Sequence, residues 1–465
     1  MALVACENTN LASTTPKRQD SLPVHSSPST DPEGPAFSKQ TADSSTPRTS
    51  ATEGSAVGTQ DGQAPAERSV NPQIASLPPP AFVPQAQPTA QKIALLLPLS
   101  GPRELLGREL LDAAQMAVFD LADEKFSILP FDTKGSEAGA AAAATAAVQA
   151  GVDLILGPLL ASSVQAVRPV ADRAGISVVA FSNSREVAGN GVYILGFVPQ
   201  QQVEAVVDFA ISEGLYRYAA IAPNDAYGRA VIEALRRAAA DREAEIVRVE
   251  FYDPAATDFS QAAKTIADYD RRHKALLEQR AELEARDDEI SQQTLKRLEK
   301  LDTLGDVDFD AVLLPGRGQQ LKAVASLLSF YDVDQPAVRL LGLSNWAQTA
   351  NIETEPSLNG GWYAAPPRDE RETFFQRYRQ IYGRSPAAIA SLAYDATALA
   401  IVLARSGYGF SRAQLIQPHG FLGVDGLFRL RDEGVAERVF EIREVTRKGF
   451  TVRRPAIQAF PQAGG

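Results

Sequence analysis

The stretch VDLILGPLLASSVQAVRPVADRAGISVVAFSNS, residues 152–184, reads as a strand, a loop, a helix, a second strand and a second loop. Val152 to Leu156 is a short apolar run, typical of a strand buried on both faces of a parallel sheet. Ile176 to Phe181 repeats that pattern after the helix. Ser162 or Ser163 is placed to cap the helix between the two strands.

Both predicted strands end in small polar loops, and ligands of open parallel sheets bind beyond the carboxyl ends of the strands. If the strands are neighbours in the sheet, both loops line one crevice. The candidate ligand-binding residues from these loops are Ala161, Ser162, Ser163, Asn183 and Ser184.

The chain as a whole is too long for one compact core, since it has 465 residues, and two lobes plus additional segments are expected. Its formal net charge of −11 argues against a nucleic-acid partner, which selects basic surfaces. No apolar run approaches the roughly 20 residues needed to span a bilayer.

The N-terminal segment contains the single cysteine, Cys6, in the sequence Leu3-Val4-Ala5-Cys6. This resembles a bacterial lipobox, in which the cysteine is lipidated and anchors the protein to a membrane; the alternative is a chance cysteine in a tail. Five residues before Cys6 are too few for a signal peptide, so the true start is expected upstream. The Ser-, Thr- and Pro-rich remainder of residues 1–91 predicts a disordered spacer, or a low-complexity tail without a role.

From Lys92 onward, short apolar runs alternate with helical patterns, which predicts doubly wound parallel sheets in an α/β fold. In the first βα turn, Ser100 and Gly101 could offer backbone N–H groups to an anionic ligand, although an ordinary turn is equally compatible. Asp225 is expected to cap a helix over residues 227–240. Near the end, residues 427–445 predict an antiparallel pair of strands.

Residues 271–300 differ from the rest because they are densely charged with both signs and contain no Gly or Pro. They predict one or two exposed helices inserted before a strand at residues 311–314. The segment is either a solvated arm or a docking surface for a partner, and the sequence favours neither.

No catalytic pattern is found. The chain has three histidines, none in a motif, and it has no HExxH, P-loop, GxSxG or paired-cysteine motif. We therefore predict a binding or regulatory protein with no catalytic residues, no metal and no cofactor.

Several segments together resemble the type I periplasmic binding proteins, of which the leucine/isoleucine/valine-binding proteins are transport members: residues 93–119, 152–184, 218–229, 311–320 and 394–404. The resemblance implies two doubly wound, Rossmann-like lobes joined by three crossovers, with a small-molecule ligand between them. Lobe one is expected over about 92–198 and 366–422. Lobe two is expected over about 199–365 and 423–452 with the insertion at 271–300, and residues 453–465 form a tail.

The same resemblance assigns site residues. The serine that such proteins offer from the first loop falls at Ala161, with Ser162 adjacent, and Tyr227 matches an aromatic residue that lines the cleft. Arg317, in the loop 315–318, is a further cleft candidate. The acidic partner of the ligand's ammonium falls near Ser344, and a buried ammonium without a carboxylate is costly.

A second set of blocks resembles the proteobacterial penicillin-binding-protein activators: residues 157–159, 301–310, 330–333, 360–366 and 391–396. Such activators are lipoproteins with this fold that stimulate a peptidoglycan synthase and are not enzymes. The best-known members carry a helical repeat domain where this chain has its spacer. The resemblance implies a periplasmic protein, lipid-anchored to the outer membrane, with a penicillin-binding protein as partner. The alternative is a substrate-binding protein of a transporter for branched-chain amino acids.

Overall fold

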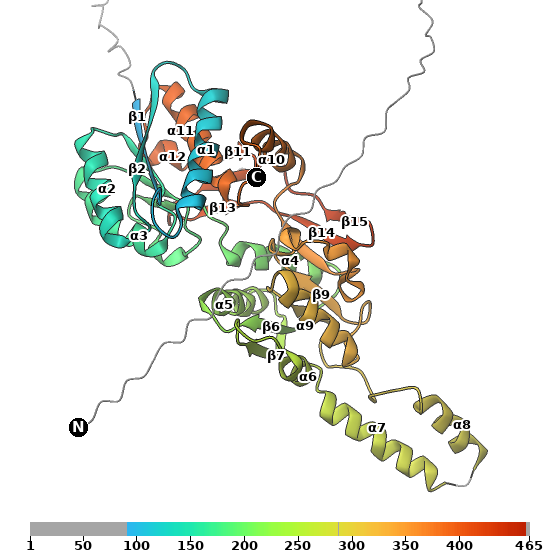
Figure 1. Ribbon diagram of the computed structural model, residues 1–465. Helices are drawn as coiled ribbons and strands as arrows, with labels where there is room; N and C mark the ends of the chain where they lie inside the picture. Colours follow the sequence, from blue (N-terminus) through green and yellow to red (C-terminus); the bar gives the residue numbers. More distant parts are fainter. Residues whose placement is uncertain (1–90, 287, 462–465) are drawn as a thin grey trace, which may run out of the picture. The chain divides into compact units, whose positions relative to one another are not determined.

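The computed structural model describes residues 91–286 and 288–461 (Figure 1). Cys6 and all but the last residue of the segment predicted over residues 1–91 lie outside the described residues, as do residues 462–465. Gln91, assigned to the spacer, is the first residue of the first strand.

Lobe one is built on a five-stranded parallel sheet of order β2-β1-β3-β4-β5. Side chains of β1 alternate between two cores. Ile93, Leu95 and Leu97 pack with α1 and with α11 (Ala390–Ser406), whereas Ala94 and Leu96 pack with α2 and α3. Both faces are therefore buried, which explains the unbroken apolar run. The elements are β1 (Gln91–Leu97), α1 (Glu104–Leu121), β2 (Phe126–Asp132), α2 (Glu137–Gln149), β3 (Leu154–Leu156), α3 (Ala161–Ala174), β4 (Val178–Ala180), η1 (Arg185–Val187) and β5 (Val192–Ile194).

Lobe two is built on a seven-stranded sheet of order β15-β14-β10-β9-β8-β6-β7, parallel except for β14 and β15 at one edge. Helices α4 and α5 form one hydrophobic core with one face of this sheet, and α6 and α9 form a second core with the other face. Its elements before the last crossover are α4 (Pro199–Ser212), β6 (Arg217–Pro223), α5 (Ala226–Ala240), β7 (Glu245–Tyr252), α6 (Ser260–Ile266), β8 (Ala311–Leu313), α9 (Gly318–Phe330), β9 (Arg339–Gly342), η2 (Trp346–Gln348), η3 (Ile352–Thr354), η4 (Pro356–Leu358) and β10 (Trp362–Ala365).

The chain passes between the lobes three times: after β5, after β10 and after β13. The second passage returns it to lobe one, where α11 packs along α1 (Figure 1). The predicted alternation of strands and helices in two doubly wound lobes is thereby confirmed. The remaining elements are α10 (Asp369–Tyr382), α11 (Ala390–Ser406), α12 (Arg412–Leu415), β11 (Phe421–Gly423), β12 (Gly426–Leu430), β13 (Ala436–Arg438), β14 (Glu441–Thr446) and β15 (Gly449–Arg454).

The division near the C-terminus differs from the predicted one. Strands β11 to β13 form a small antiparallel sheet, and Phe428, Leu430 and Ala436 belong to the core of lobe one. The chain therefore returns to lobe two near residue 439 and not at 423, because these apolar side chains complete the α1–α11 core. The predicted tail also starts too early, since β15 extends to Arg454 and Phe460 is buried.

The charged insertion was predicted to form one or two helices, and it forms two: α7 (Tyr269–Glu284) and α8 (Glu289–Leu298). We call them the arm. They pack on each other through Leu276, Leu283 and Leu298 and extend away from α6 (Figure 1). Ile290, in α8, is 78% exposed and takes no part in that contact.

Candidate functional site

The first βα turn is already occupied by a carboxylate of the chain itself. Asp132, at the end of β2, accepts hydrogen bonds from the backbone N–H groups of Leu99 (2.9 Å), Ser100 (3.2 Å) and Lys134 (2.7 Å), and from Ser100 Oγ (2.6 Å). Burial raises the pKa of Asp132, but these hydrogen bonds outweigh that effect and hold the pKa below its ordinary value. The backbone N–H and the hydroxyl of Ser100 are therefore engaged by Asp132, which weighs against a ligand role for Ser100. Asp132 accepts no hydrogen bond from the N–H of Gly101, and the role expected for Gly101 stays a prediction.

The loop between β3 and α3 also differs from the prediction. Helix α3 begins at Ala161, and its N-cap is Leu160, which makes no side-chain cap. Neither Ser162 nor Ser163 therefore caps the helix. Ser163 is instead 1% exposed, and its Oγ has no hydrogen-bond partner among the described residues.

Asn183, Ser184 and Tyr227 are brought together around one cavity of about 500 Å³, between the end of β4 and the first turns of α4 and α5. Asp225 positions Tyr227 by accepting a hydrogen bond from the N–H of Gly228 (2.8 Å), which is the predicted helix cap. We call this cavity the cleft pocket. It is lined by Asn183, Ser184, Arg185, Glu186, Val198, Pro199, Gln200, Ala226, Tyr227, Ala230, Glu233, Ala234 and Arg237.

Tyr227 is fixed by a residue that the sequence reasoning missed. Asn345 Nδ2 donates to Tyr227 Oη (2.9 Å) and to the carbonyl of Pro315 (3.2 Å). Burial raises the pKa of Tyr227, so its phenol stays protonated at neutral pH. The available signal was the polar loop after β9, in which we selected Ser344 and passed over its neighbour Asn345.

The two acidic residues of the cleft pocket are exposed, and each already interacts with a neighbouring side chain. Glu186 bonds to the hydroxyl of Ser184, which lowers its pKa. Glu233 pairs with Arg237 at 3.1 Å, with side chains 53% and 58% exposed. A ligand ammonium would therefore meet no desolvated carboxylate among these lining residues.

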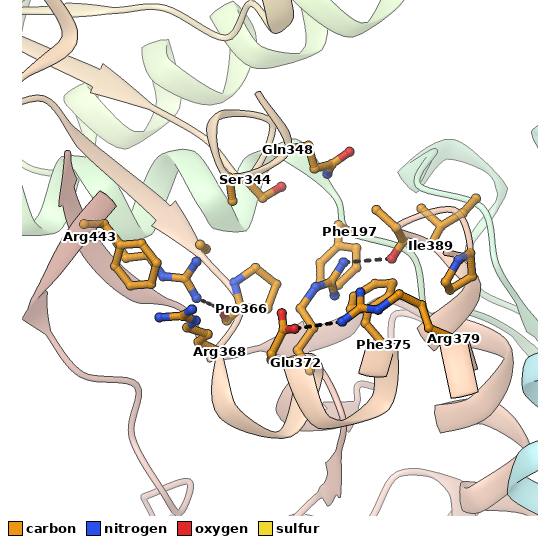
Figure 2. Close-up of a pocket in the computed structure, with 16 residues that line it drawn as sticks. Phe197, Ser344, Gln348, Pro366, Arg368, Glu372, Phe375, Arg379, Ile389 and Arg443 are labelled. Atoms are coloured by element: carbon orange, nitrogen blue, oxygen red, sulfur yellow. Dashed lines mark hydrogen bonds and ion pairs between the residues drawn. The ribbon is translucent and has the colours of Figure 1, made fainter. Parts of the chain in front are cut away.

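Ser344 lines a different cavity, of about 370 Å³, together with Gln348 and residues of the second crossover (Figure 2). The backbone N–H of Ser344 donates to Gln202 Oε1 of α4 (2.9 Å). The two cavities share no lining residue. We call this one the hinge pocket. It is lined by Phe197, Ser344, Ala347, Gln348, Ala365, Pro366, Arg368, Arg371, Glu372, Phe375, Arg379, Pro386, Ala388, Ile389, Arg443 and Phe450.

The other candidates line neither pocket. Arg317 is exposed at the N-cap of α9, where its positive charge opposes the rise in the pKa of Tyr227 that burial causes. Ala161 and Ser162 are half-buried in the first turn of α3. The predicted set therefore divides into one group of three around the cleft pocket, Ser344 at the hinge pocket, and residues outside both.

Within residues 91–286 and 288–461, no group of three or more His, Cys, Asp or Glu side chains is placed to hold a metal ion. In the same part of the chain, no helix is both long and apolar enough to cross a bilayer.

Two doubly wound lobes, three crossovers and a cavity at the carboxyl ends of parallel strands define a two-lobed α/β binding protein. The family model described as periplasmic binding protein matches residues 90–429. The chain belongs to this family, which places it in the periplasm.

Solved structures share the fold at low sequence identity. A putative branched-chain amino acid ABC transporter protein from Rhodospirillum rubrum is 17% identical, with a TM-score of 0.61 over 78% of this chain and 99% of that one. Leucine-binding protein LivK from Thermotoga maritima is 18% identical, with a TM-score of 0.51 over 79% and 99%. Full-length LpoA from Haemophilus influenzae is 16% identical, with a TM-score of 0.57 over 79% of this chain and 59% of LpoA.

Among curated proteins, an uncharacterized protein of Rickettsia prowazekii, RP748, is 20% identical over 176 residues. The match covers 38% of this chain and 47% of that protein, about half its length.

Proposed function

We propose that this chain is a non-enzymatic envelope lipoprotein, anchored to the outer membrane through Cys6, that binds and stimulates a penicillin-binding protein in peptidoglycan synthesis. The observation that carries the proposal is the arm, a charged pair of helices held in a fixed direction on lobe two. The sequence resemblance to the activators and the fold shared with LpoA also support it.

The base of the arm is locked by one buried arginine. Arg272 is 5% exposed; its Nε donates to the carbonyl of Gly305 (2.9 Å), and its Nη1 donates to the carbonyls of Ala267 (3.2 Å) and Tyr331 (3.4 Å). The Arg272 carbonyl accepts from the N–H of Leu304 (3.0 Å). Burial lowers the pKa of Arg272. A buried guanidinium that holds three carbonyls fixes both ends of the insertion to lobe two.

The exposed side chains of the arm form a surface suited to a protein partner. Lys274 and Glu278 pair at 3.5 Å with side chains 76% and 64% exposed, a pair that contributes little to stability. Leu277 and Ile290 are 49% and 78% exposed. Exposed charges of both signs steer and orient a partner, and the apolar side chains add area to bury on contact.

The cleft pocket weighs against recognition of an α-amino acid, because Glu186 and Glu233 are exposed and already paired. Transport of branched-chain amino acids remains the second candidate, favoured by the fold shared with LivK over 99% of its length. Calorimetry with leucine, isoleucine and valine decides between the two. We expect no tight binding, whereas a micromolar dissociation constant, about −8 kcal/mol, would support transport.

The experiment for the activator proposal measures binding to each purified penicillin-binding protein of the same organism by interferometry. The test variant replaces residues 277–297 by a short Gly-Ser loop, which keeps Arg272 and the Leu276–Leu298 contact at the base. We expect the full chain to bind one synthase in a salt-sensitive manner, because exposed charges are screened over about 8 Å at physiological ionic strength. The arm variant should bind more weakly. Equal binding by both would remove the arm from the interface, and no binding to any synthase would refute the proposal.

A further inference from the structure

The hinge pocket draws its walls from both lobes and from two crossovers (Figure 2). Ser344 and Gln348 come from lobe two, whereas Phe375 and Ile389 come from lobe one. Its volume of about 370 Å³ lies within the range of small-molecule sites, about 300 to 1,000 Å³. Of its lining, only Ser344 was among the predicted ligand-binding residues, and the proposed activation of a synthase does not use this cavity.

The lining is strongly basic, in a chain whose net charge is −11. Four of its residues are arginines, Arg368, Arg371, Arg379 and Arg443, and one is acidic, Glu372. Glu372 pairs with Arg379 at 3.1 Å.

Two further carboxylates lie next to the lining. Asp425 pairs with Arg371, and Glu441 pairs with Arg443. With these included, the pocket keeps one positive charge in excess, which matches a ligand with one negative charge.

The two most buried arginines are held in place before any ligand arrives. Arg371 Nη2 donates to the carbonyl of Ala388 (2.7 Å), and Arg443 Nη2 donates to the carbonyl of Pro366 (2.7 Å). The guanidinium of Arg371 also lies 5.1 Å from the ring centre of Phe375. Donors that are fixed in advance lose little entropy when they bind an anion.

Arg443 and Arg368 lie over the same aromatic ring. Their guanidinium carbons are 4.3 Å and 5.3 Å from the centre of Phe450. Two like charges near one ring repel each other, and an anion close to both would be attracted by each. The first turn of α10 starts beside Arg368 without a side-chain cap, and its acidic residues Asp369, Glu370 and Glu372 offset the helix dipole there, so the attraction for an anion comes from the arginines.

We propose that the hinge pocket binds a small organic acid with one carboxylate and a flat apolar body. The carboxylate is recognised by Arg368 and Arg443 beside Phe450, and the apolar body packs toward Phe375 and Ile389. The site is separate from the cleft pocket and does not depend on the proposed activation of a synthase.

The test is calorimetry of the purified chain with benzoate as the probe. Benzamide keeps the ring and lacks the charge, and inorganic phosphate keeps a charge and lacks the apolar body. We expect benzoate to bind at least tenfold more tightly than either. Equal affinity for benzamide, tighter binding of phosphate, or no binding of benzoate would each overturn the proposal.

Three variants locate the site. Arg368→Gln should weaken benzoate binding about tenfold, equivalent to 1.4 kcal/mol. Arg368 is exposed, so we expect this variant to fold normally, and circular dichroism checks that it does. Arg447→Gln removes the same charge from the exposed turn between β14 and β15, and Ala230→Trp fills the cleft pocket. Both should bind benzoate as the unaltered chain does. Loss of binding in Ala230→Trp with no effect of Arg368→Gln would place the ligand in the cleft and refute the assignment.

Discussion

Arg272→Ala should release the arm from lobe two. The side chain donates to the carbonyls of Gly305 and Ala267 at 2.9 Å and 3.2 Å, and more weakly to Tyr331 at 3.4 Å. Each buried carbonyl left without a partner costs about 1–3 kcal/mol. Removal of the charge recovers part of its desolvation cost, so we expect a loss of about 3 kcal/mol in the local stability of the arm.

Cleavage of the arm by a glutamate-specific protease measures this loss. Such a protease cuts at Glu278 and Glu282, which the variant and its control both keep. Where cleavage follows local opening, 3 kcal/mol corresponds to roughly a hundredfold faster cleavage. The matched control is Arg271→Ala, since Arg271 is 67% exposed and pairs with Asp268. Such exposed pairs contribute about 0–1 kcal/mol. Cleavage of the two variants at equal rates would refute the locking role of Arg272.

Two further predictions concern buried or hydrogen-bonded carboxylates. Burial raises the pKa of Asp395 to about 6, although Arg438 and Arg371 oppose the shift; the folded chain therefore keeps a proton that the unfolded chain releases above about pH 4. The resulting contribution to the free energy of unfolding, up to about 3 kcal/mol, is present below pH 4 and is lost as the pH rises to about 6. Urea titrations should show this slope in the unaltered chain and a flatter profile in Asp395→Asn; equal slopes would contradict it. Asp132→Ala should lower the free energy of unfolding by about 2 kcal/mol at pH 7, because three backbone N–H groups and Ser100 Oγ lose their acceptor. Since the folded pKa of Asp132 is lowered, this difference should be constant above about pH 4, the pKa in the unfolded chain, and should shrink as the pH falls below it; a pH-independent difference would contradict the assignment.

The fold was predictable because its signals are local. A central strand such as β1 is an apolar run, Ile93 to Leu97, because both of its faces are buried. The helices between the strands are marked by apolar residues at helical spacing. The boundary near residue 423 was not predictable, since Phe428 and Leu430 are equally suited to either core and only tertiary packing assigns them to lobe one.

The site was predictable only where it lies at strand ends. Asn183, Ser184 and Tyr227 follow β4 and β6 and meet at the cleft pocket. The role of Asp132 depends on the register of β1 and β2, which sets Leu97 beside it.

The arginines of the hinge pocket come from α10 and its N-cap and from β14, which are far apart in the sequence. No local pattern marks Arg368 and Arg443 as neighbours, because their common contact with Phe450 arises only when the crossovers are in place.

The most direct measurement of the proposed function is the rate at which each purified penicillin-binding protein of the same organism polymerises its lipid-linked glycan precursor, with and without the intact chain. We predict that the chain raises the rate of one synthase, and that the variant with residues 277–297 replaced raises it less. An unchanged rate for every synthase, at low and at physiological salt, would contradict the activator function.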